Sequence, residues 1–164
     1  MRQSLAGLQA AGVKVTRPRA LALLAEAHGK VDQVEEGLKA LAEARDLVQK
    51  TGERQWKAEL YRLKGELTLQ QSKVQSPKSK VEESPESEAD ECFCKAIEIA
   101  RKQQAKSLEL RASTSLACLW QQQGKKAEAH KLLSEVYSWF TEGLDTKDLQ
   151  EAKALIDSPE SQKV

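Results

Sequence analysis

The chain has 164 residues, a length that suits one domain or one stretch of a repeat array. Its 26 Lys and Arg nearly balance its 25 Asp and Glu, and a net charge of +1 does not attract polyanions, which argues against general binding to nucleic acids or membrane surfaces. No apolar run is long enough to span a membrane, and no secretory signal is visible. The number of Cys residues is three, which is odd, so we expect reduced thiols in a cytoplasmic protein.

The composition and the spacing of the apolar residues both predict an all-α chain. Ala, Leu, Glu, Lys and Gln dominate, and these residues lose little side-chain freedom in a helix. Apolar residues recur at helical spacing, for example at Leu38, Leu41 and Val48. The connections between the segments are short, which predicts antiparallel helix hairpins. In chain order, the predicted helices cover 18–29, 33–50, 53–70, 86–104, 106–123, 125–141 and 147–156.

A pattern of small and large residues occurs three times along these helices. The first helix of each hairpin carries a small residue, which is Ala25, Gly65 or Ala117. The small residues are 40 and then 52 positions apart, and the 12 extra positions lie between Thr68 and Ala89, so their removal restores a period of 40. On the second helices, the matching triplets are Gly37/Leu41/Ala44, Ala89/Phe93/Ala96 and Ala129/Leu133/Val136.

This pattern resembles the tetratricopeptide repeat (TPR), in which W-x2-L-G-x2-Y is followed by A-x3-F-x2-A. The fullest match is Tyr61, Lys64, Gly65 and Thr68, followed by the triplet that contains Phe93. The period of 40 exceeds the usual period of about 34, and the proline that closes each repeat is missing. The longer period is similar to the long-repeat variety in the C-terminal helical regions of bacterial signalling ATPases, cyclases and transcription activators.

The resemblance implies a right-handed α-solenoid of about three repeats plus a terminal capping helix. We therefore treat 1–164 as a single TPR-like domain. Its predicted parts are a partial preceding helix (1–12), repeat 1 (17–52), repeat 2 (53–104) with a flexible insertion at about 72–87, repeat 3 (105–143) and the capping helix (145–157).

The resemblance also implies that the first helices line a concave face that binds a protein or peptide. Projection of the family pattern onto this chain places a mixture of basic, acidic and polar residues on that face. They are Arg19, Glu26, Lys30, Glu59, Arg62, Glu66, Gln70, Arg111, Thr114 and Gln122.

We expect a non-catalytic protein- or peptide-binding scaffold, as a C-terminal fragment of a larger bacterial signalling protein. The first alternative is self-association through an uncapped N-terminal end that exposes Leu5 and Leu8. The second is a small-molecule sensor, which requires a closed apolar pocket. The insertion is predicted to be a solvated loop, with a docking or regulatory segment as its alternative.

Other residues that could carry chemistry have simpler structural interpretations. Cys92 and Cys94 are two positions apart on a predicted helix, so they face different directions; we expect buried thiols and no zinc site. No Ser-His-Asp or Cys-His signature is present, so we predict no enzyme, no cofactor and no metal. Trp139 and Phe140 are expected to pack against the last helix.

Overall fold

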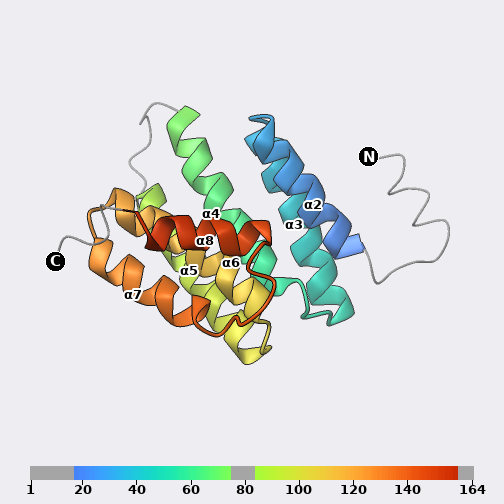
Figure 1. The fold of residues 1–164 in the computed structure, drawn as a ribbon. Helices are drawn as coiled ribbons and strands as arrows, with labels where there is room; N and C mark the ends of the chain where they lie inside the picture. The colour runs from blue at the N-terminus through green and yellow to red at the C-terminus, as the bar shows by residue number, and fades with distance from the viewer. Residues whose placement is uncertain (1–16, 75–83, 159–164) are drawn as a thin grey trace.

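The structure, a computed structural model, describes residues 17–74 and 84–158. Within these ranges the chain is all helical and contains no strand, which confirms the predicted all-α class for this part (Figure 1). None of the described helices has both the length and the apolarity that crossing a membrane requires. The helices are α2 (Arg17–Lys30), α3 (Val34–Thr51), α4 (Lys57–Val74), α5 (Pro85–Lys102), α6 (Lys106–Gln122), α7 (Lys126–Tyr137) and α8 (Lys147–Ile156).

The ends of the predicted insertion are helical, which corrects the expectation of a loop over 72–87. Helix α4 continues to Val74, and α5 begins at Pro85. The Ser84 Oγ accepts a hydrogen bond from the Ser87 backbone N–H at 3.2 Å, and Pro85 occupies the first turn, where no amide donor is lost. The remainder of the predicted insertion, 75–83, lies outside the described residues, as does the predicted partial helix at 1–12.

The helices pack as successive pairs. Helices α2 and α3, α4 and α5, and α6 and α7 contact each other within a pair, and the second helix of each pair also contacts the first helix of the next. The first helices contact one another in order, α2 with α4, α4 with α6 and α6 with α8. These contacts between first helices build one face of the molecule from α2, α4, α6 and α8 (Figure 1).

Small residues allow the paired helices to approach closely. A Cβ atom added at Gly65 of α4 would lie 2.6 Å from the Phe93 ring of α5, and one added at Gly37 of α3 would lie 3.2 Å from the Ala25 backbone oxygen of α2. Since Phe93 is fully buried, its ring has little room to move away. The small and large residues of the sequence pattern therefore meet between the helices of a pair.

Two turns inside the pairs have the same geometry. Asp32 and Gly124 both have positive φ, 57° and 81°, and they are 92 positions apart, which is the sum of the sequence offsets of 40 and 52. After Asp32, the Gln33 N–H donates to the His28 oxygen at 2.9 Å. After Gly124, the Lys125 N–H donates to the Trp120 oxygen at 2.8 Å. The same turn also occurs between two pairs, at Gln104, where φ is 55° and the Ala105 N–H donates to the Ala100 oxygen at 3.0 Å, so this turn is common to connections within and between pairs.

Two predictions about single side chains near the surface are wrong. Trp139 is 60% exposed and does not pack against α8; its ring meets the Phe140 ring edge-on, and only Phe140 joins the buried cluster with Leu149. Helix α7 ends at Tyr137, so Trp139 lies in the connection to α8. Cys94 is exposed as well, because its neighbour Cys92 takes the buried side of α5.

Candidate functional site

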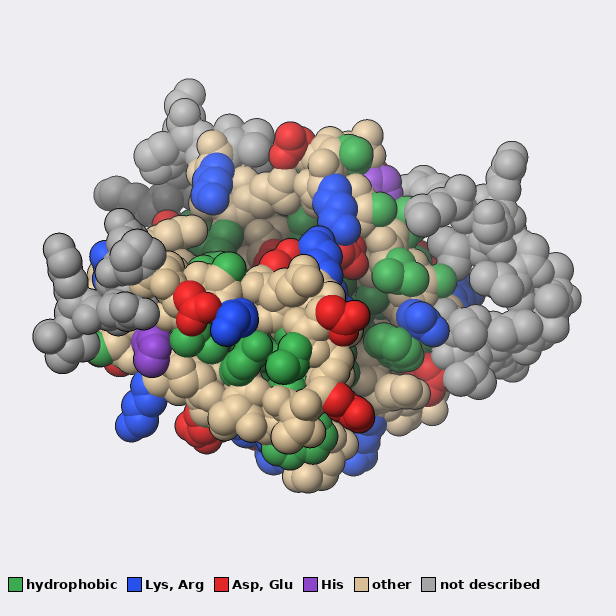
Figure 2. Space-filling view, in the orientation of Figure 1, with side chains coloured by type: hydrophobic (Ala, Val, Ile, Leu, Met, Phe, Trp, Pro, Cys, Tyr) green, Lys and Arg blue, Asp and Glu red, His purple; other side chains and the backbone are tan. Residues whose placement is uncertain are grey.

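A groove of about 930 Å³ lies on the face formed by α2, α4, α6 and α8. Figure 2 shows a hollow near the centre of this face, with charged side chains of both signs around it. Except for Asp32 and Phe93, all lining residues come from these four helices. Eight of the ten residues predicted for a concave face line the groove: Glu26, Lys30, Arg62, Glu66, Gln70, Arg111, Thr114 and Gln122.

The other two predicted residues do not line the groove. The Arg19 guanidinium lies over the Trp56 ring, 5.3 Å from its centroid, at the connection between α3 and α4. Glu59 is only 5% exposed and is buried among its charged neighbours. Arg19 and Glu59 are one period of 40 apart in the sequence. Their side chains nevertheless contact different neighbours, and the period does not predict these neighbours.

Arg62 is buried in a cluster of ion pairs on α4. It is 5% exposed, and it donates to both carboxylate oxygens of Glu59 at 2.7 and 3.0 Å and to Glu66 one turn further along. Burial alone lowers the pKa of Arg62, but the hydrogen bond with Glu59 and the charges of Glu66 and Glu59 outweigh burial and raise it. Arg62 therefore stays charged, and its guanidinium is bound to carboxylates of its own helix. This differs from the expectation that it is accessible to a ligand.

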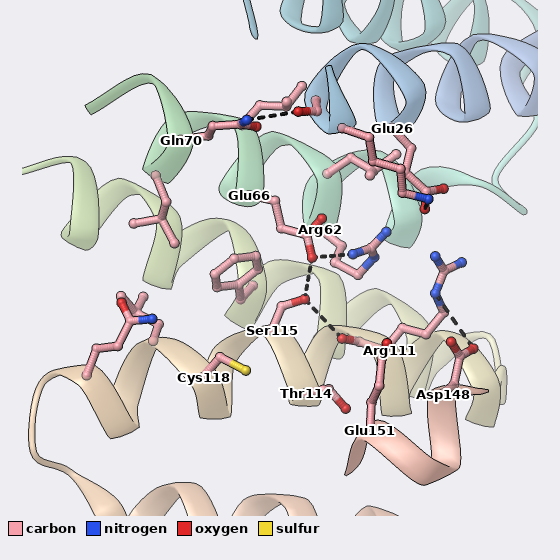
Figure 3. A pocket seen from close by; sticks show the side chains of 18 of the residues that line it. Glu26, Arg62, Glu66, Gln70, Arg111, Thr114, Ser115, Cys118, Asp148 and Glu151 are labelled. Carbon is pink, nitrogen blue, oxygen red and sulfur yellow. Dashed lines mark hydrogen bonds and ion pairs between the residues drawn. The ribbon is translucent and has the colours of Figure 1, made fainter. Parts of the chain in front are cut away.

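The same cluster connects three helices (Figure 3). Arg111 of α6 lies 2.9 Å from the Glu59 carboxylate and 3.8 Å from that of Asp148 on α8. Ser115, also on α6, donates its hydroxyl to Glu66 at 2.8 Å. We call this set, Glu59, Arg62, Glu66, Arg111, Ser115 and Asp148, the ionic floor of the groove. Its contacts join α4 to α6 and α6 to α8 across the groove.

A second set of bonds fixes the edge formed by α2. The Gln70 side-chain amide of α4 donates to the Gly29 oxygen at 2.8 Å and to the Asp32 carboxylate at 2.7 Å. Glu26 pairs with Lys30 at 2.9 Å. The hydrogen bond from Lys30, followed by the positive charges nearby, holds the pKa of Glu26 below its ordinary value although burial opposes this shift. Gln70 thus also has a structural role in this edge.

Among the predicted residues that line the groove, Thr114 and Gln122 have the fewest contacts with other side chains. The Thr114 hydroxyl donates to the Leu110 oxygen of its own helix, and Gln122 is exposed at the end of α6. Cys118 also lines the groove, and burial together with the charges of Glu66 and Glu151 raises the pKa of its thiol. The groove end near Gln122 is therefore its most accessible polar part.

Sequence reasoning missed the contribution of α8. Lys147, Asp148 and Glu151 line the groove, whereas the sequence suggested only a cap over the last repeat. The signal was present, because Glu151 follows Arg111 by one period of 40. With these residues included, the lining contains five basic and five acidic side chains, so it is electrically balanced.

Within the described residues, no group of three or more His, Cys, Asp or Glu side chains is arranged to hold a metal ion. Comparisons of the chain with models of protein families, with curated proteins and with solved structures each give no match.

Proposed function

We propose that the chain is a right-handed TPR-like α-solenoid and that its groove binds an extended segment of another protein without catalysing a reaction. One observation carries the proposal: the first helix of each successive pair contributes to a single groove. The close contact between Gly65 and Phe93 supports the repeat register on which the solenoid rests. Solenoids of helix pairs commonly use such concave surfaces for binding.

The chemistry of the groove favours a polar peptide that carries both signs of charge. The ten charged side chains of the lining are balanced, so neither a purely acidic nor a purely basic ligand is attracted. Most of these charges are already paired within the protein, as in the ionic floor. A ligand therefore gains more from extended contact along the groove than from any single ion pair.

Binding can be tested with an array of peptides of mixed charge, followed by titration calorimetry of the peptides that bind. Gln122→Trp places a bulky ring at the accessible end of the groove, and Gln123→Trp is its matched control, because Gln123 is an adjacent exposed glutamine outside the lining. We expect Gln122→Trp to weaken binding at least tenfold and Gln123→Trp to leave it unchanged. If the two variants weaken binding equally, or if no peptide binds, the groove is not the binding site.

A second candidate function is self-association through the outer face of α2. Leu23 on this face is 51% exposed, whereas Leu63, one period later on α4, is 2% exposed and packs in the same core cluster as residues of α3. Among the described helices only α3 and α4 contact α2, so none covers Leu23 in the way that α3 covers α4. Leu5 and Leu8, predicted for this role, lie outside the described residues.

The oligomeric state tests this second candidate. Sedimentation velocity over a range of concentrations should show a mass that rises with concentration in the wild type and stays at the monomer value in Leu23→Glu. Leu144→Glu is the matched control, because Leu144 is similarly exposed but lies beyond α7. A wild type that is monomeric at all concentrations would exclude self-association.

A further inference from the structure

A second cavity, of about 260 Å³, lies where α3 turns into α4, and it shares no lining residue with the groove. Buried Val48 and Leu60 form part of its wall. Its other lining residues are Arg45 and Gln49 of α3, Gly52 and Arg54 at the turn, and Lys57 and Tyr61 of α4, and we call this site the basic pocket.

The basic pocket has an unbalanced charge, unlike the groove. Arg45, Arg54 and Lys57 contribute three positive charges, and no carboxylate is among its lining residues. None of these three side chains forms an ion pair with the residues that the structure describes, whereas Arg62 and Arg111 in the groove are both paired. The three side chains are exposed to solvent, and three cations at one small cavity with no carboxylate in its lining create a positive potential that favours an anion.

The turn between α3 and α4, which carries Arg54, is held in place without a ligand. Gly52 has a φ of 72°, which favours glycine, and its N–H donates to the Val48 oxygen at 3.0 Å. The Arg54 oxygen accepts hydrogen bonds from the Gln103 side chain at 2.5 Å and from the Lys57 N–H at 3.1 Å. The backbone of the site is thus fixed in advance, which reduces the entropy lost on binding.

One of the cations is also oriented by an aromatic ring. The Arg45 guanidinium lies 5.7 Å from the centroid of the Tyr61 ring, within the range of a cation–π interaction. This contact holds the planar guanidinium at the cavity and leaves its N–H groups available to an acceptor. Arginine presents these donors as a rigid fork that matches the oxygens of phosphate or carboxylate.

We propose that the basic pocket binds a phosphate monoester. Three cations match the double negative charge and the three terminal oxygens of such a group better than the single charge of a carboxylate. The cavity is smaller than the roughly 300–1,000 Å³ typical of sites for drug-sized ligands, which suits a phosphate group rather than a large organic molecule. This site does not depend on peptide binding in the groove.

Titration calorimetry of the full chain tests the proposal with four probes: inorganic phosphate, a phosphoserine peptide, the same peptide without phosphate, and acetate. We expect saturable binding of the two phosphate probes, weakened by high salt, and no binding of acetate or the unmodified peptide. Similar affinity for both phosphate probes indicates a site for free phosphate groups, and tighter binding of the peptide indicates a phosphorylated protein as the source.

Arg54→Gln removes one cation of the basic pocket and keeps the backbone oxygen that Gln103 binds. Lys131→Gln is the matched control, because it makes the same change in net charge at an exposed position of α7 outside the pocket. Arg54→Gln should raise the dissociation constant for phosphate about tenfold, as expected for the loss of a charge-assisted hydrogen bond, and Lys131→Gln should not change it. Absence of saturable phosphate binding, or equal effects of the two variants, would overturn the proposal, and circular dichroism checks that both variants fold.

Discussion

The groove and the basic pocket each contain two arginines, but the arginines differ in what surrounds them. Arg62 and Arg111 share the Glu59 carboxylate in the ionic floor, so their charges connect α4 to α6. Arg45 and Arg54 have no carboxylate partner among the described residues. The difference indicates that a basic residue on a concave face can be part of the framework, whereas an unpaired cluster at a turn remains available to a ligand.

The largest expected effect comes from removing one partner in the ionic floor. Arg62→Ala leaves Glu59 charged and buried without its main partner, and we expect a loss of about 3–5 kcal/mol in the free energy of unfolding. Arg54→Ala, in the basic pocket, should change it by no more than about 0.5 kcal/mol. Urea unfolding followed by circular dichroism measures both. Equal losses in the two variants would remove the distinction between the paired and the unpaired arginines.

A smaller effect is expected where α4, which carries much of the ionic floor, packs against α5. Gly65→Ala places a Cβ 2.6 Å from the buried Phe93 ring, so we expect overpacking that costs about 1–3 kcal/mol. Gly29→Ala is the control, because the added Cβ comes only to 3.0 Å from one terminal methyl group of Leu67 and alanine favours the helix. Thermal and urea unfolding should rank Gly65→Ala well below Gly29→Ala in stability. The reverse order would contradict the proposed helix register.

The smallest expected effect is on the pH dependence of the free energy of unfolding, and it comes from Glu26 in the groove. The hydrogen bond from Lys30 lowers the pKa of Glu26 in the folded state, so the unfolded chain takes up this proton at a higher pH than the folded chain does. Its contribution to stability is therefore present above the pKa of the unfolded state and is lost as the pH falls through the folded pKa. Glu26→Gln should reduce the fall in unfolding free energy between pH 6 and pH 3. An unchanged pH profile would show that the pair does not stabilise the α2 edge.

Local patterns were sufficient to predict the helices and much of the groove lining. Apolar spacing and small residues act within one or two turns of helix, so they predicted the seven described helices within a few residues, α8 with the same bounds. The resemblance to the TPR pattern then implied a concave face of ten residues, eight of which the structure brings to one groove. The largest errors in helix ends occur at α4 and α7, where no glycine or proline in the sequence marks the boundary.

The roles of individual side chains required the tertiary structure. Glu59 and Arg62 are both on α4 as predicted, but both are buried, and Glu59 also pairs with Arg111 of a helix about 50 positions away. Arg19 was placed on the concave face and instead lies over Trp56. The basic pocket has no sequence motif, because its cations come from two helices and a turn that meet only after folding.

The sequence by itself determined the all-α class and the places where paired helices meet, because helix propensity and the need for small residues at close contacts are local properties. The tertiary structure decided which charges are neutralised. Arg62 pairs with Glu59 and Glu66 on its own helix, but Arg111 pairs with Glu59 and Asp148 of two other helices, at 2.9 and 3.8 Å, and the packing that sets these distances is not encoded in any short segment. The division between a framework of paired arginines and a pocket of unpaired cations is therefore a property of the folded chain alone.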